Sequence, residues 1–145
     1  MDTDVASNLL GSIPRGEEIH DPRAGDHLDA KLAGVELVQN STGSWAIKAV
    51  WSGIEDTDGN SFEHQERFNI PTRDSDPVVA RIFLGTLHSL ELVPTSDKQA
   101  VYAETDDHRE QLVEAFKTKV GASYPIRLRE SNDGFLRLRF LKKRT

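Results

Sequence analysis

Two short segments near the end of the chain alternate arginine with apolar residues. The first carries Arg127 and Arg129, and the second carries Arg137 and Arg139. A turn-forming run, Ser-Asn-Asp-Gly at 131–134, separates them and predicts a β-hairpin. Alternation with a period of two places all four arginines on one face of the paired strands. Guanidinium groups bind phosphate and stack flat on bases, so this face has the chemistry to contact a polyanion.

The same pattern has a simpler interpretation, which is the solvated face of a half-exposed hairpin with a charged, protected edge. That interpretation expects charges of mixed sign. Like charges opposite each other on paired strands, about 5 Å apart, destabilise the pair unless other groups compensate them. The compensation can come from acidic residues elsewhere in the protein or from a bound polyanion, and the sequence leaves both open.

The charge of the 145-residue chain is unevenly distributed. Residues 117–145 contain nine basic and two acidic residues, a net charge of +7, whereas the whole chain carries −6. The preceding 116 residues therefore carry −13. Such asymmetry predicts a bipolar surface, with one face able to meet a polyanion and the rest repelling it.

Other residues are candidates to extend the basic face. Phe135 is in phase with Arg137 and Arg139, so its ring is placed to support a base. Lys48 and Arg67 point away from the apolar faces of their strands, where they either continue the basic track or are solvated surface.

The two tryptophans, Trp45 and Trp51, are further candidates for base stacking. They share a strand face with Ile47, so at least one of them is expected in the core. The candidate nucleic-acid-binding residues are therefore Arg127, Arg129, Arg137, Arg139, Phe135, Trp45, Trp51, Lys48 and Arg67.

Catalytic and metal chemistry find little support. The chain has no cysteine, and its five histidines lack the spacing of a metal site. The run 56–60 resembles a calcium loop, but its glycine falls one place early and Arg67 occupies the twelfth position, so a hairpin turn is expected. No acid, base or nucleophile set stands out. We expect no enzyme activity, no cofactor and no metal.

The hydrophobic periods predict five strands and two helices. A lead-in at 1–26, acidic and rich in glycine and proline, is expected to be a poorly ordered arm before a single domain at 27–145. The predicted strands are 28–38, 45–52, 62–70, 124–129 and 136–140. The predicted helices are 77–92, with the stripe Val79, Ile82, Phe83, Leu87 and Leu90, and 106–120, with the stripe Leu112, Phe116 and Val120.

This order, β-β-β-α-α-β-β, is that of a five-stranded barrel of the oligonucleotide-binding (OB) type. A half-barrel, or an α+β sheet packed on helices, would have the same order of elements. The fold class expected is mainly β with helices, with an OB-type barrel as the leading interpretation.

Several segments resemble tailed-phage single-stranded DNA-binding proteins with an OB fold. They are Gly-Val-Glu-Leu at 34–37, Trp-Ala-Ile-Lys at 45–48, Phe-Asn-Ile-Pro at 68–71, Leu-Glu-Leu-Val-Pro at 90–94 and Tyr-Pro-Ile-Arg-Leu-Arg at 124–129. The resemblance covers about residues 28–141 and implies coating of single strands during replication or recombination. Such proteins often end in an acidic tail, whereas this chain ends Leu-Lys-Lys-Arg-Thr.

The function expected is sequence-tolerant binding of single-stranded DNA. The alternative is a non-enzymatic protein interaction module whose basic hairpin binds an acidic protein partner. Replication or recombination proteins are further expected partners, and both a monomer and a homodimer are compatible with the sequence. Acidic residues near Met1 and the lack of a long apolar run favour the cytoplasm, that of a bacterial host if the chain is phage-encoded.

Overall fold

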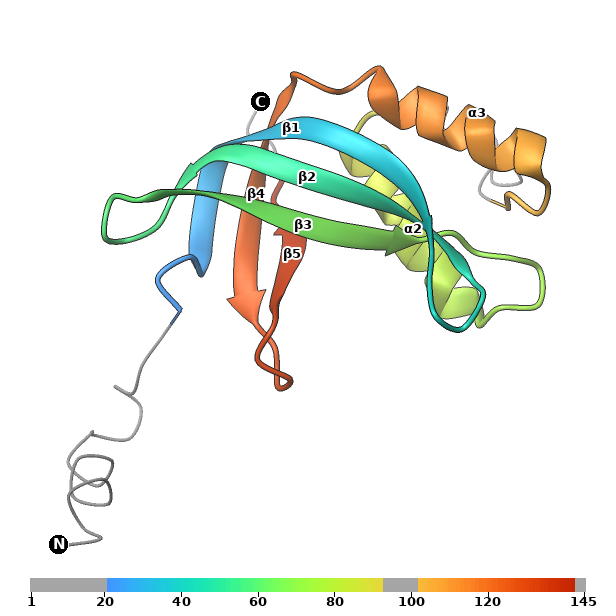
Figure 1. The fold of residues 1–145 in the computed structure, drawn as a ribbon, viewed down its shortest axis with the longest axis horizontal. Helices are drawn as coiled ribbons and strands as arrows, with labels where there is room; N and C mark the ends of the chain where they lie inside the picture. The colour runs from blue at the N-terminus through green and yellow to red at the C-terminus, as the bar shows by residue number, and fades with distance from the viewer. Residues whose placement is uncertain (1–20, 93–101, 143–145) are drawn as a thin grey trace, which may run out of the picture.

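The computed structural model describes residues 21–92 and 102–142, which form one five-stranded antiparallel sheet and two helices (Figure 1). The elements are β1 (Gly25–Gln39), β2 (Trp45–Glu55), β3 (Ser61–Asn69), α2 (Pro77–Ser89), α3 (Asp106–Lys117), β4 (Ser123–Glu130) and β5 (Leu136–Phe140). The strands lie in the order β3-β2-β1-β4-β5. The predicted order of elements and the mainly β class are confirmed. No helix within the described ranges is long and apolar enough to span a membrane.

The long first strand β1 curls the sheet. Its C-terminal part pairs with β2, and its N-terminal part pairs with β4. The register shifts between Leu32 and Gly34 on the β2 side and between His27 and Ala30 on the β4 side. Such bulges bend a strand and increase its twist. Figure 1 accordingly shows β4 and β5 running at a steep angle to β2 and β3.

The folded part begins earlier than the sequence predicts. Gly25 and Asp26 pair with Leu128 and Arg127 of β4, so β1 starts three residues before the expected position. The prediction of an arm extending to residue 26 is therefore wrong at its end, because backbone pairing with β4 holds these residues. The predicted arm over 1–20 lies outside the described residues.

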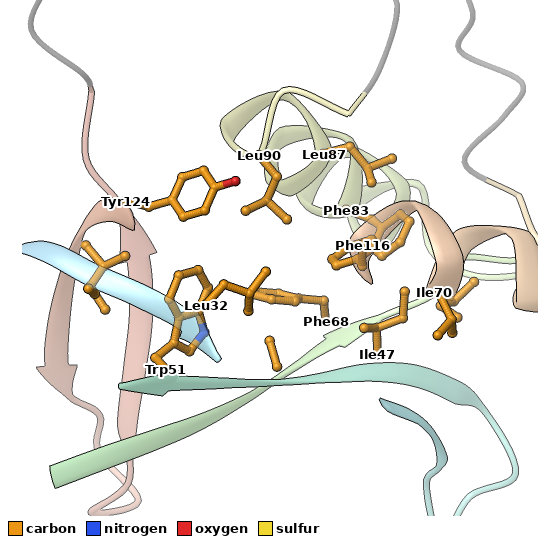
Figure 2. Close-up of a cluster of buried hydrophobic side chains, with 14 of the residues drawn as sticks. Leu32, Ile47, Trp51, Phe68, Ile70, Phe83, Leu87, Leu90, Phe116 and Tyr124 are labelled. Atoms are coloured by element: carbon orange, nitrogen blue, oxygen red, sulfur yellow. The ribbon is translucent and has the colours of Figure 1, made fainter. Parts of the chain in front are cut away.

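The core lies between the inner face of the sheet and the two helices (Figure 2). Ile47, Ala49 and Trp51 alternate inward along β2, as their period predicts. The helices cover one end of the sheet, where Phe116 of α3 packs against Phe83 of α2 with ring centroids 6.1 Å apart. Stacked and tilted rings bury large apolar areas and contribute strongly to such a core.

The two helices start at the predicted positions 77 and 106, and the residue before each start caps the helix. Asp76 precedes Pro77, and its carboxylate accepts a 2.9 Å hydrogen bond from the Val78 N–H. Thr105 begins α3 in the same way, with its hydroxyl accepting from the His108 N–H. These caps satisfy N–H groups that have no partner inside the helix.

The predicted apolar stripes of the helices are wrong at two positions. Ile82 of α2 is 65% exposed, and Thr86 is buried instead. Val120 is exposed because α3 ends at Lys117 rather than at the predicted Val120. The backbone beyond it turns toward β1, where the Gly121 N–H donates to the Leu32 carbonyl at 2.8 Å.

Substitution of Phe116 tests this packing. Phe116→Ala should lower the free energy of unfolding by about 3–5 kcal/mol, because it removes a fully buried ring and leaves a cavity. Ile82→Ala is the matched control and should change it by less than about 0.5 kcal/mol, since exposed substitutions have small effects. Urea unfolding followed by tryptophan fluorescence measures both. A large loss for Ile82→Ala would contradict the placement of that helix face.

Candidate nucleic-acid interface

The four arginines of the closing hairpin share one face of β4 and β5, as predicted. Arg127 lies opposite Arg139, and Arg129 lies opposite Arg137. The intervening Leu128 is buried on the inner face. Like charges therefore face each other across the strands, and the neighbouring carboxylates decide how much of this charge is compensated.

A carboxylate of β1 neutralises one of the four arginines. Arg127 donates two hydrogen bonds to the carboxylate of Asp26, from Nε at 2.5 Å and from Nη2 at 3.1 Å. These bonds lower the pKa of the Asp26 carboxyl below its ordinary value of 3.8 and raise the pKa of Arg127. Because the native pKa of Asp26 is lowered, the pair's contribution to stability is complete above about pH 4 and is lost as pH falls through the lowered value.

A carboxylate in the turn between β4 and β5 neutralises a second arginine. Arg137 donates to Asp133 at 2.8 Å. Hydrogen bonds from the Ser131 hydroxyl, then from the Phe135 N–H, together with the charge of Arg137, lower the pKa of the Asp133 carboxyl. The Arg137 guanidinium also lies 5.8 Å from the centroid of the Phe135 ring, which is 65% exposed. This turn therefore presents an aromatic ring and a cation side by side.

The remaining two arginines of the hairpin have no acidic partner within the described residues. Arg129 and Arg139 are exposed, and neither contacts a carboxylate among residues 21–92 and 102–142. Carboxylates in these ranges thus neutralise two of the four hairpin arginines.

Trp51 lies in the core, as predicted for at least one of the two tryptophans. It is fully buried and makes edge contact with Tyr124, with centroids 5.9 Å apart, so its ring is not accessible to a base. Trp45 is half-buried, and the guanidinium of Arg109 covers its ring at 4.7 Å from the centroid. Phe135 is therefore the most exposed of the three aromatic candidates.

A hollow brings together three of the predicted cations from three different strands. It has a volume of about 570 Å³ and adjoins the boundary between β3 and β5, which we call the seam. The residues that line this seam hollow are Lys48, Gln65, Glu66, Arg67, Asn69 and Arg137. Lys48 and Arg67 are direct cross-strand partners, and Arg137 approaches from β5.

Nearby polar groups hold the first two cations in place. Arg67 donates a 2.8 Å hydrogen bond to Asn40 Oδ1, and Lys48 Nζ lies 3.6 Å from Glu36 Oε1. Asn40 belongs to the turn between β1 and β2, and its amide also donates to Asn69 at 3.3 Å. The cations are therefore oriented by residues that the charge pattern alone does not single out.

Sequence reasoning missed Glu66 and the seam itself. The alternation of β3 assigns Glu66 to the apolar face, between His64 and Phe68. The sequence did contain a signal for this contact, which is a carboxylate at a position that alternation assigns to the apolar face. A buried carboxylate needs hydrogen-bonding partners, so such a position predicts a polar contact. Its partner on β5 depends on the curl of the sheet, which the sequence pattern does not specify.

Comparison with known proteins gives no family model and no curated protein that matches this sequence. The interface is therefore interpreted from its own geometry and charge.

Removal of the neutralising carboxylates should strengthen binding of a polyanion. Asp26→Asn frees Arg127 and Asp133→Asn frees Arg137, so each should raise the affinity for heparin by about two- to fivefold at low salt. Glu110→Gln, which removes an exposed carboxylate on α3, is the charge-matched control and should have a smaller effect. Affinity chromatography with a salt gradient and titration calorimetry measure the change. Equal effects of all three variants would contradict local competition for these arginines.

Proposed function

We propose that the curled sheet is a barrel of the OB type and that the chain holds single-stranded DNA on it, without chemistry on the DNA. The order of elements, with the helices between β3 and β4, supports the barrel. The terminal strands of the sheet also approach each other, since the Phe68 and Phe140 rings stack with centroids 6.1 Å apart. The resemblance to tailed-phage proteins suggests a role in DNA replication or recombination.

The observation that carries the proposal is the convergence of Lys48, Arg67 and Arg137 on the seam hollow beside the exposed ring of Phe135. Phosphates bind to cations irrespective of base, and every base has a face that can stack on an aromatic ring. A site of this composition is expected to tolerate any sequence. The ring favours single strands, because the base faces of a duplex are already stacked on one another.

Arg129 and Arg139, which have no acidic partner in the described ranges, extend this track beyond the hollow. Arg139 is exposed on the same strand as Arg137, and Arg129 lies opposite Arg137 on β4. Phosphates that follow the hairpin would meet these cations in succession. The net charge of −13 on the first 116 residues would repel DNA elsewhere and confine it to this region.

Salt-dependent titration of labelled oligo-dT tests the proposal. Binding should weaken as salt rises, with the logarithm of the association constant falling by about 0.7 per neutralised phosphate for each unit of log salt. Arg67→Ala and Arg137→Ala should each weaken binding at low salt and reduce that slope by about 0.7, with no change in base preference. Fluorescence anisotropy at several salt concentrations measures both quantities.

Arg81→Ala is the matched control, because Arg81 is an exposed arginine of α2 that does not line the seam hollow. It should leave the slope unchanged. Absence of oligo-dT binding by the parent chain at low salt would contradict the proposed function.

The second candidate function is binding of an acidic protein partner. It is favoured by the apolar surface of α2, where Val79 and the exposed Ile82 line a second hollow of about 510 Å³ between α2, β3 and β5. Arg67 and Arg139 also line this helix-side hollow, so its chemistry suits a segment that combines acidic and apolar side chains. Weak and equal affinities for heparin and oligo-dT, in the titration above, would favour this candidate.

A further inference from the structure

The two end strands of the sheet meet without a backbone ladder. Within the described residues the backbone of β3 pairs with β2 alone, and the backbone of β5 pairs with β4 alone. Yet Glu66 contacts Leu138, and Phe68 stacks on Phe140, so residue numbers rise together along the two strands. β3 and β5 therefore approach each other at these two points through side chains.

Glu66 makes the one polar contact across the seam that the described residues provide. Its Oε1 accepts a 3.2 Å hydrogen bond from the Leu138 N–H, an edge group of β5. The same oxygen accepts from Nε2 of His64 at 2.7 Å, and the two side chains are 14% and 8% exposed. A carboxylate with so little access to water depends on these donors, and so the pair holds Glu66 toward β5.

The position of this contact relates it to the cations of the interface. Glu66 is adjacent in sequence to Arg67, and Leu138 lies between Arg137 and Arg139. Glu66 also lines both the seam hollow and the helix-side hollow. The separation of β3 and β5 at this point therefore fixes how far Arg67 lies from the arginines of β5.

We propose that Glu66 is a positioning residue, whose carboxylate anchors β5 to β3 and thereby sets the spacing of the phosphate-binding cations. This inference rests on the proposed function. It opposes the expectation from charge alone, because a carboxylate among cations repels phosphate and its removal should strengthen binding. The length of the Glu66 side chain and its charge therefore predict opposite changes in DNA affinity when Glu66 is replaced. Two conservative variants separate these two effects.

Glu66→Asp keeps the charge but shortens the side chain by about 1.5 Å, so it should lose the contact with Leu138. Amide exchange at Leu138 should then be about tenfold faster, and oligo-dT affinity should fall by about three- to tenfold with an unchanged salt slope. Glu66→Gln keeps the reach and the acceptor oxygen. It should keep exchange at Leu138 within about twofold of the parent and bind oligo-dT at least as tightly as the parent.

Glu63→Gln is the control for charge, since Glu63 is an exposed carboxylate of the same strand. It should leave exchange at Leu138 unchanged. Exchange at amides of the β1–β2 ladder distinguishes local opening of the seam from global unfolding, and these amides should remain protected in every variant.

Two outcomes would overturn the positioning role. One is an Asp variant with parental exchange at Leu138, and the other is an Asp variant with faster exchange but parental affinity. Amide exchange is measured on the free protein, so it tests the hydrogen bond between Glu66 and Leu138 in the absence of DNA. A parent chain that fails to bind oligo-dT would instead overturn the proposed function, together with the part of this inference that concerns DNA.

Discussion

The fold depends on how the two ends of a small sheet are brought together. Five strands are enough to curl a sheet almost onto itself, but β3 and β5 share no backbone ladder in the described part of the chain. The bulges of β1 bend the sheet, and Glu66 with the Phe68 and Phe140 rings supplies side-chain contacts between β3 and β5. The approach of Arg137 to Lys48 and Arg67 follows from this arrangement, because β5 reaches β3 only when the sheet is curled.

The electrostatics of the interface follow from partial compensation. Arginines that face each other across β4 and β5 repel, and this repulsion opposes the pairing of the hairpin. Asp26 and Asp133 relieve it at two of the four positions, one from a neighbouring strand and one from the turn. Full compensation would leave nothing to attract a polyanion, and none would destabilise the hairpin. The observed division permits both a stable hairpin and an accessible positive surface.

Much of the fold could be predicted from local sequence. Alternation identified the strands, and the turn residues near Gly59 and Gly134, both with positive φ, identified the hairpins. The hydrophobic periods gave the starts of both helices, which the structure shows to be capped by Asp76 and Thr105. The shared face of the four arginines followed from the period of two alone. These features are encoded within a few residues, so a single sequence is enough to predict them.

Features that depend on distant contacts were not predicted. The period of β2 gives Trp45 and Trp51 the same face, but only the packing of Tyr124 and Arg109 shows that both rings are covered. The exposure of Ile82 likewise depends on which side of α2 meets the sheet. The convergence of Arg67 and Arg137 requires the curl, so the charge pattern predicted the members of the site but not their grouping.

The way in which the seam is closed has a further physical consequence. A backbone ladder holds neighbouring strands about 4.8 Å apart and leaves no room for a ligand between them. A carboxylate that bridges two strands holds them farther apart, because the length of the side chain is added to the separation. The edge groups of β3 and β5 on either side of Glu66 then border open hollows rather than each other. A side-chain contact between β3 and β5 thus supports the curl while it leaves the space in which Lys48, Arg67 and Arg137 meet.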